Sequence, residues 1–216
     1  MTGWIVRTCR QNKSFLLFVV LMCIFRSAVA DWNDVPTGSM QPTIIEDDRI
    51  FVNKMAYDIR VPFTHLSLIH LVDPSRGEII VFDSKVSEKR LVKRVVGIPG
   101  DVVSLLDNEL KINGEPLVYE DIDSTNLTVD KKEDLFGVGY LIRTHLSGSR
   151  MSNFNPVEVP QGYYLVLGDN RDNSADSRMI GLVPRDEIVG RTRSVVLSLD
   201  YENFLLPRKD RFFHAL

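Results

Sequence analysis

The chain has 216 residues, of which 25% are charged and 44% hydrophobic, ordinary values that exclude wholesale disorder, collagen and low-complexity repeats. Its two cysteines, Cys9 and Cys23, both lie in the first thirty residues, so the rest of the chain has no disulfide framework and no cysteine-based metal site. Residues 1–30 carry a net charge of +4 and residues 31–216 a net charge of −7, and an acidic body is a poor nucleic-acid binder.

The first element is an unbroken apolar run over residues 15–25 (FLLFVVLMCIF), behind a basic head. It is typical of a cleaved signal peptide, with Ala28-Val29-Ala30 as a small-x-small cleavage site, or of an uncleaved signal anchor over residues 14–30. A helix of this length spans roughly 25 Å, slightly less than a hydrocarbon core of about 30 Å. In both interpretations the positive charges keep residues 1–13 in the cytoplasm, and the body is exported.

Strand-like runs dominate the body, without internal repeats or a helical pattern of comparable strength. A mainly β fold is therefore predicted. Residues 119–160 are acidic and polar with few strand signals, so we interpret them as a surface insert between two β-rich halves. The expected strands are residues 49–54, 78–82, 91–96, 102–106, 109–112, 163–167 and 188–199, with a tight turn at Asn113-Gly114.

The four histidines form no HExxH pair and no cluster with cysteine or aspartate at metal-ligand spacing, and His65 and His70 are expected on a surface loop. A P-loop and a GxGxxG fingerprint are also absent from the sequence. We therefore expect no metal ion and no organic cofactor.

One strand carries two adjacent cations, Lys93 and Arg94, which point to opposite faces, so one of them must lie among apolar neighbours. If the strand lies at an edge, both side chains can instead reach solvent. Burial lowers the pKa of a lysine, and a neutral lysine is a competent general base. Ser39 follows a glycine in a loop bounded by prolines, which makes it the natural nucleophile for such a base.

Four blocks occur in this order: the apolar segment, residues 36–43 (PTGSMQPT), RGEIIVF with KRVVGIPGD within residues 76–101, and residues 168–178 (GDNRDNSADSR). Together they resemble the bacterial type I signal peptidases, membrane-anchored Ser–Lys proteases that remove signal peptides from exported preproteins. The resemblance covers residues from about 12 to 200.

The resemblance implies a role for each matching residue. Ser39 is the nucleophile and Lys93 its general base, while the hydroxyl of Thr37 and the backbone N–H of Ser39 form the oxyanion hole. Ser174 orients the lysine ammonium. Residues implied to support the site are the ion pair of Asp176 and Arg178, the turn residues Met40 and Pro42, and Gly168, Asp169 and Asn170.

The fold implied is an antiparallel, β-barrel-like core, of the type shared with SOS-repressor proteases, after one N-terminal transmembrane helix. Its catalytic core comprises residues 31–106 and 161–216, and residues 107–160 form a small non-catalytic insert. The implied partners are preprotein signal peptides, cleaved after Ala-x-Ala, and the lipid bilayer. The implied location is the bacterial inner membrane, crossed once, with the catalytic domain on the periplasmic face.

Two questions concern the ends of the chain. The resemblance favours a retained anchor, yet Ala28-Val29-Ala30 also suits slow self-cleavage after Ala30. The C-terminal tail mixes aromatic and basic residues, so it either contacts anionic lipid headgroups or packs on the domain.

Three alternatives to the general enzyme stay open. The first is a peptidase dedicated to one precursor. The second is a self-cleaving SOS-type repressor, which needs a DNA-binding segment where this chain has its apolar run. The third is an exported β-rich binding module, which leaves Ser39, Lys93 and Ser174 unexplained.

Overall fold

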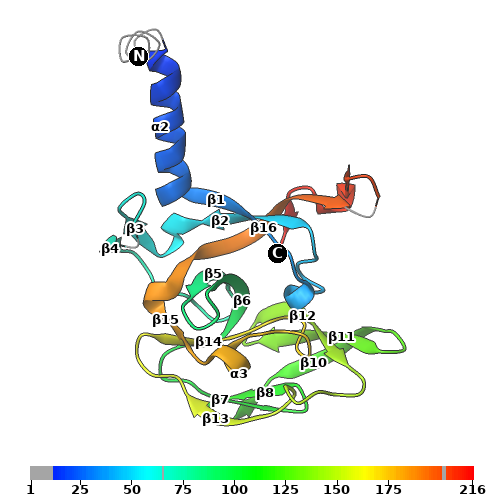
Figure 1. The fold of residues 1–216 in the computed structure, drawn as a ribbon. Helices are drawn as coiled ribbons and strands as arrows, with labels where there is room; N and C mark the ends of the chain where they lie inside the picture. The colour runs from blue at the N-terminus through cyan, green and yellow to red at the C-terminus, as the bar shows by residue number, and fades with distance from the viewer. Residues whose placement is uncertain (1–11, 65, 201–202) are drawn as a thin grey trace.

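The computed structural model describes residues 12–64, 66–200 and 203–216, and the fold is mainly β, as predicted (Figure 1). Residues 1–11 of the expected cytoplasmic segment and His65 lie outside the described residues. The helices are α2 (Lys13–Ala28) and α3 (Ser177–Ile180), and the 3-10 turns are η1 (Gly38–Met40), η2 (Lys54–Ala56), η3 (Arg185–Glu187) and η4 (Lys209–Arg211). The strands are β1 (Ala30–Asp34), β2 (Asp48–Asn53), β3 (Asp58–Arg60), β4 (Ser67–His70), β5 (Ile79–Ser84), β6 (Lys89–Gly97), β7 (Val102–Leu106), β8 (Glu109–Ile112), β9 (Glu115–Pro116), β10 (Val118–Ser124), β11 (Thr128–Leu135), β12 (Val138–His145), β13 (Phe154–Glu158), β14 (Tyr163–Leu167), β15 (Val183–Pro184), β16 (Ile188–Asp200), β17 (Leu206–Pro207) and β18 (His214–Ala215).

Helix α2 projects away from the sheets, with its large apolar side chains exposed (Figure 1). Among the described residues, no helix has both the length and the apolar character needed to cross a membrane. The anchor over residues 14–30 therefore stays a prediction. At the base of α2, Arg26 pairs with Asp31 at 2.8 Å and stacks on Trp32, which fixes the start of β1. Ala30 is buried and pairs with Asn53 of β2, and self-cleavage after Ala30 stays a hypothesis.

The central sheet has the order β1-β2-β16-β5-β6-β14-β15, and β17 and β18 also pair with β16. Its strands pair antiparallel, as predicted. The described strand pairs leave β1 and β15 at open ends, so the sheet does not close into the ring that a barrel-like core requires. The sheet instead buries its surface in two separate clusters.

Strand β5 divides those clusters, because successive side chains of a strand point to opposite faces. Ile79 and Val81 pack with Met40 of the η1 turn, whereas Ile80 and Phe82 pack with Tyr57 on the other face. The first cluster therefore supports the loop that carries Ser39.

The segment between β6 and β14 forms two further sheets, β10-β11-β12 and β13-β7-β8-β9. They enclose a third apolar cluster, to which Leu105, Ile112, Leu135 and Ile142 contribute. The expectation of few strands in residues 119–160 is wrong, since β10 to β13 lie there. In β11 the exposed face is polar, with Lys132 and Asp134, and the buried face includes Glu133. The polar composition therefore masks the alternation of this strand.

The C-terminal tail pairs with β16 through β17 and β18. Arg211 binds the fully buried Asp48, and Arg208 donates to Ser198 Oγ at 3.0 Å. Two of its three basic side chains therefore bind the domain itself. Contact of the tail with lipid stays a prediction, which now rests on Lys209 and on exposed aromatic rings such as Phe204.

Candidate active site

The η1 turn presents Ser39 beside the GDNRDNSADSR segment. Asn170 holds this turn twice: its backbone N–H donates to Ser39 O at 3.1 Å, and its side-chain amide donates to Gly38 O at 3.0 Å. Met40, 1% exposed, packs beneath the turn, and Pro42 follows a cis peptide bond. These contacts fix the backbone that carries the Ser39 hydroxyl.

Strand β6 places Lys93 opposite that hydroxyl. The Lys93 ammonium donates to Ser39 Oγ at 2.7 Å and to the carbonyl of Val92 at 3.0 Å. A nucleophile and a base at this separation can exchange a proton directly. The two residues are 54 positions apart in the sequence, and the structure brings them into contact.

Burial sets the charge state of Lys93, which is only 2% exposed. Loss of hydration lowers the pKa of its ammonium from an ordinary 10.5 to about 8, against the opposing attraction of Asp176 and Asp169. Neither carboxylate is hydrogen-bonded to Lys93. A usable fraction of Lys93 is thus neutral near pH 8.

Arg94 points to the opposite face of β6 and is also buried, so the strand buries both cations rather than one. Its guanidinium binds Asp169 through two hydrogen bonds of 2.8 and 2.6 Å. Asp169 also accepts from Thr43 Oγ1 at 2.6 Å. Arg94 and Asp169 therefore connect β6 and the GDNRDNSADSR segment to the loop that carries Ser39.

Ser174 lies beside Gly168 but does not make the hydrogen bond to Lys93 that the resemblance implies. Its hydroxyl is buried and has no hydrogen-bond partner among the described residues, so a bond to the Lys93 ammonium is absent. Gly168 separates Ser174 from the η1 turn: a Cβ at Gly168 would lie 2.2 Å from Ser174 Oγ and 2.5 Å from Ser39 O. Only a residue without a side chain fits there.

Asp176 and Arg178 form a buried, bidentate ion pair, with a closest approach of 2.6 Å. Asp176 also accepts from the backbone N–H of Gly168 at 3.0 Å, and Arg178 donates to Met151 O at 2.7 Å. The pair thus connects the glycine beside Ser39 to the loop before β13.

A small cavity of about 170 Å³ opens beside Ser39 and Lys93. Thr37 stands at its edge, exposed and without a side-chain hydrogen bond to another described residue, so its hydroxyl is free to donate to a bound group. Asp34 and Arg90 also line the cavity. The apolar lining residues are Val35, Pro36, Met40, Leu91 and Val92.

One edge of β6 is unpaired beside this cavity. Strand β14 pairs with Arg94, Val95 and Gly97 only, so residues 89–93 of β6 have a strand partner on the β5 side alone within the described part of the chain. An extended peptide can add to such an edge through backbone hydrogen bonds.

Other side chains that hold the site were not identified from the sequence. Arg143 of β12 donates to Gln41 Oε1 at 3.0 Å and pairs with Asp130, and Thr43 Oγ1 contacts Leu141 O at 3.3 Å. These contacts join segments about 100 residues apart, and no local pattern signals them. Within the described ranges, no cluster of three or more His, Cys, Asp or Glu residues suits a metal ion.

Comparison with known proteins gave a family match, two related sequences and one related structure. A profile of the family "signal peptidase, peptidase S26" matches residues 8–197. Signal peptidase I of Pseudomonas fluorescens is 37% identical over 206 residues, which cover 87% of this chain and 72% of that protein. Signal peptidase I T of Bacillus subtilis is 33% identical over 185 residues, 85% of this chain and 82% of that protein. A crystal structure of a signal peptidase I from Enterococcus faecalis, 32% identical, covers 56% of this chain and 97% of the solved chain with a TM-score of 0.38.

Proposed function

Because the chain belongs to the signal peptidase family, peptidase S26, and is therefore a signal peptidase, we propose that it cleaves preproteins with Ser39 as nucleophile and neutral Lys93 as general base. The observation that carries this proposal is the 2.7 Å contact between Lys93 Nζ and Ser39 Oγ, made by a lysine whose pKa is lowered to about 8. A serine activated by a lysine is a known variant of the catalytic triad.

The proposed reaction has two stages. Lys93 takes the proton of Ser39 while Ser39 Oγ attacks the scissile carbonyl, and the Ser39 N–H and the Thr37 hydroxyl donate to the oxyanion. The C–N bond then breaks, Lys93 returns the proton to the leaving amine, and the signal peptide remains as an ester on Ser39. Lys93 next deprotonates a water molecule, which hydrolyses the ester and restores the serine.

The preference for Ala-x-Ala is proposed to arise from the small cavity. A substrate that adds to the free edge of β6 is extended, so its residues at −1 and −3 point to the same side. Both then face the limited space between Val35, Met40 and Leu91. Small side chains fit there, and larger ones are excluded.

We also propose that residues 14–30 anchor the enzyme in the bacterial inner membrane, with the catalytic domain on the periplasmic face. Support comes from the exposed apolar surface of α2 and from the connection of ten residues between α2 and Ser39, which limits their separation to roughly 35 Å. The anchor is tested by alkaline extraction and protease protection of the full chain in membranes. Release of the full chain into the soluble fraction would contradict it.

The catalytic proposal is tested with a detergent-solubilised full chain and a preprotein that has an Ala-x-Ala site. The intact enzyme is expected to cleave after the −1 alanine, and Ser39→Ala and Lys93→Ala are each expected to abolish cleavage. Lys111→Ala, an exposed lysine in β8, is the matched control and should cleave normally. Cleavage that survives Lys93→Ala at neutral pH would mean that another group is the base.

A further inference from the structure

The carbonyl of Gly38 decides where the backbone N–H of Ser39 points. The two groups belong to one peptide unit, which is planar, so they point in opposite directions. Gly38 O accepts hydrogen bonds from the side-chain amide of Asn170 at 3.0 Å and from the backbone N–H of Gln41 at 3.1 Å. These two donors therefore fix the direction of the Ser39 N–H, which is the proposed backbone donor to the oxyanion.

The side chain of Gln41 also packs against Gly38. A Cβ on Gly38 would lie 2.8 Å from Gln41 Nε2 and 2.9 Å from Gln41 Cδ, so the amide group lies directly beside this glycine. The oxygen of the same amide, Oε1, accepts from Arg143 Nη1 at 3.0 Å. Because a guanidinium can only donate, Arg143 determines which end of the amide faces it and which end faces Gly38.

Arg143 is itself held on β12 by Asp130, its partner in register on β11. The guanidinium forms a bidentate pair with this carboxylate, through hydrogen bonds of 2.6 and 2.7 Å from Nε and Nη2. A pair of this kind fixes the plane of the guanidinium. The remaining nitrogen, Nη1, is thereby directed at Gln41.

The backbone of Arg143 holds Asn170, the other donor to the Gly38 carbonyl. The N–H of Arg143 donates to Asp169 O, and its carbonyl accepts from the N–H of Arg171, both at 2.8 Å. These bonds lie on either side of Asn170, which forms a bridge with Arg143. Arg143 therefore holds one donor to the Gly38 carbonyl through its backbone and the other through its side chain.

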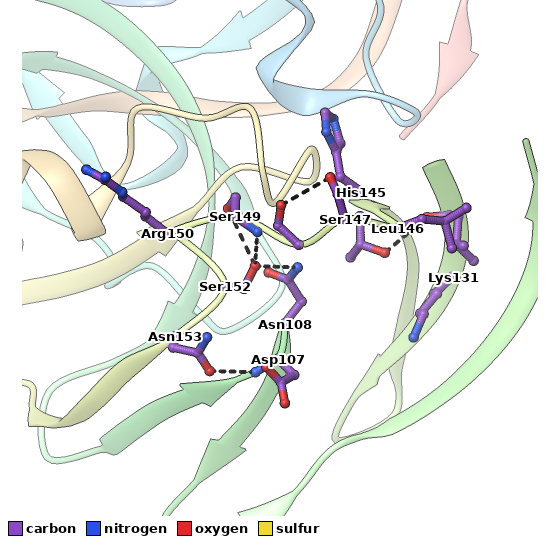
Figure 2. A pocket seen from close by; sticks show the side chains of 13 residues that line it. Asp107, Asn108, Lys131, His145, Leu146, Ser147, Ser149, Arg150, Ser152 and Asn153 are labelled. Atoms are coloured by element: carbon purple, nitrogen blue, oxygen red, sulfur yellow. Dashed lines mark hydrogen bonds between the residues drawn. The ribbon is translucent and has the colours of Figure 1, made fainter. Parts of the chain in front are cut away.

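The end of β12 is fixed independently of the Arg143 side chain. The backbone N–H of His145 donates to Asp172 at 2.8 Å, and this carboxylate also accepts from the hydroxyls of Ser149 and Ser152 at 2.5 and 2.9 Å. Figure 2 shows His145, Ser149 and Ser152 in the wall of a cavity of about 640 Å³. A substitution of the Arg143 side chain is therefore expected to leave the strand in place and to remove only the side-chain contacts.

We propose that Arg143 is a positioning residue for the oxyanion hole, because it orients Gln41 against the peptide unit that carries the Ser39 N–H. This inference rests on the proposed function, and it gives residues 107–160, expected to be non-catalytic, a part in the reaction. The Ser39 N–H stabilises the negatively charged oxygen of the transition state more than the neutral carbonyl of the bound substrate. Loss of the contact should therefore lower kcat and leave KM unchanged.

The test is preprotein cleavage by the detergent-solubilised full chain with Arg143→Met, Gln41→Met and the double variant. Removal of an oxyanion donor costs about 10²–10³-fold in kcat, so a loosened donor should cost about tenfold. Each single variant is expected to lose about tenfold in kcat, with KM within about twofold of that of the intact enzyme. The double variant should lose no more than either single one, because the two side chains act through one contact.

A substrate analogue measures the oxyanion hole directly. When a peptide aldehyde that ends at the −1 alanine binds, Ser39 Oγ adds to its carbonyl carbon, the Ser39 proton passes to Lys93, and the carbonyl oxygen becomes an oxyanion. Arg143→Met should bind this aldehyde about tenfold more weakly than the intact enzyme does. It should bind the corresponding peptide alcohol equally well, because the alcohol has no carbonyl group for Ser39 to attack.

The matched control is Arg185→Met. Arg185 also forms a bidentate pair, with Asp58 at 2.9 and 3.0 Å, and its side chain is the more buried of the two, 17% exposed against 28% for Arg143. Denaturant unfolding should therefore show at least as large a loss of stability as in Arg143→Met, while kcat stays unchanged.

Three results would overturn the inference and leave the proposed function standing. They are a normal kcat in Arg143→Met, an equal loss of kcat in Arg185→Met, and losses that multiply in the double variant. Cleavage by the intact enzyme that survives Ser39→Ala would instead overturn the proposed function, and this inference with it.

Discussion

The two faces of strand β6 bury two neighbouring cations in opposite ways. On one face, Lys93 contacts a hydroxyl and a carbonyl, and no carboxylate is hydrogen-bonded to it. On the other face, Arg94 has a bidentate carboxylate partner in Asp169 and a carbonyl partner in Gly77. Burial is almost complete on both faces, so the two cations differ in their counterion and in intrinsic basicity, because a guanidinium holds its proton more tightly than an ammonium.

The pKa values of the two groups are shifted in opposite directions. Burial lowers the pKa of Lys93 to about 8. Burial also acts to lower the pKa of Arg94, but Asp169 more than compensates and raises it above the ordinary value. A buried ammonium without a hydrogen-bonded counterion can give up its proton, whereas a guanidinium with a counterion stays charged and holds the fold together. The proposed site therefore uses one cation of each kind.

The largest loss of activity is expected when residue 93 is permanently charged. Lys93→Arg keeps a donor near Ser39, but a guanidinium does not lose its proton. We expect kcat to fall by about 10²–10⁴-fold, the usual contribution of a general base. The measurement is preprotein cleavage from pH 6 to pH 10, with Lys93→Met as a variant that lacks both charge and base. A Lys93→Arg enzyme that recovers activity as the pH rises would contradict the role of Lys93.

The second prediction leaves Arg94 without its counterion. Asp169→Asn keeps the shape of the side chain and removes its charge, so a buried guanidinium is left uncompensated. The free energy of unfolding should fall by about 3–5 kcal/mol. Denaturant unfolding of the full chain in detergent measures it. Asp186→Asn is the control, because Asp186 pairs with Lys85 at 2.9 Å in an exposed position, where the loss should stay below about 1 kcal/mol. Equal losses in the two variants would contradict the distinction between the faces.

The third prediction concerns how much the buried, charged Lys93 lowers the free energy of unfolding. Its pKa is lower in the folded chain than in the unfolded chain, so between pH 8 and 10.5 the unfolded state binds more protons. The free energy of unfolding should rise with pH across this window. Below pH 8 the charged lysine destabilises the fold by its full amount. Removing the ammonium in Lys93→Met should therefore stabilise the fold by about 3 kcal/mol at pH 7.

The same unfolding experiment at several pH values separates the effect of the charge from that of packing. The advantage of Lys93→Met over the intact chain should shrink as the pH rises from 8 to 10.5, because above pH 10.5 the intact lysine is neutral in both states. Lys111→Met, at an exposed lysine, should show no such dependence. An advantage that is independent of pH would mean that packing, rather than charge, separates the two proteins.

The sequence predicts the strands and the two central site residues better than it predicts the contacts that support them. Strands such as Tyr163–Leu167 and Glu109–Ile112 were predicted with the bounds that the structure has, since apolar alternation and turn residues are local signals. Ser39 and Lys93 were predicted as site residues, and the structure places them in contact.

The supporting contacts were harder to predict because they join distant segments. Nothing near Arg143 in the sequence indicates that it binds Gln41, and nothing near Glu133 indicates that it pairs with the buried Arg171. Polar strands such as β11 also lack an apolar pattern, since one of their buried positions is occupied by Glu133. A charge that finds its partner only in the folded chain looks like surface in the sequence.

The smallest expected effect concerns Ser174, the residue predicted to orient Lys93. Its buried hydroxyl has no hydrogen-bond partner among the described residues, which costs stability, whereas the buried hydroxyl of Ser152 binds Asp172 at 2.9 Å. Ser174→Ala should therefore raise the free energy of unfolding by about 1 kcal/mol, and Ser152→Ala should lower it by about 1–3 kcal/mol. Both are measured by denaturant unfolding at pH 7. If Ser174→Ala instead destabilises the fold, the Ser174 hydroxyl of the intact chain has a hydrogen-bond partner in solution. A simultaneous change in the pH at which cleavage is half-maximal would then identify Lys93 as the partner, because a hydrogen bond to the ammonium favours the protonated form.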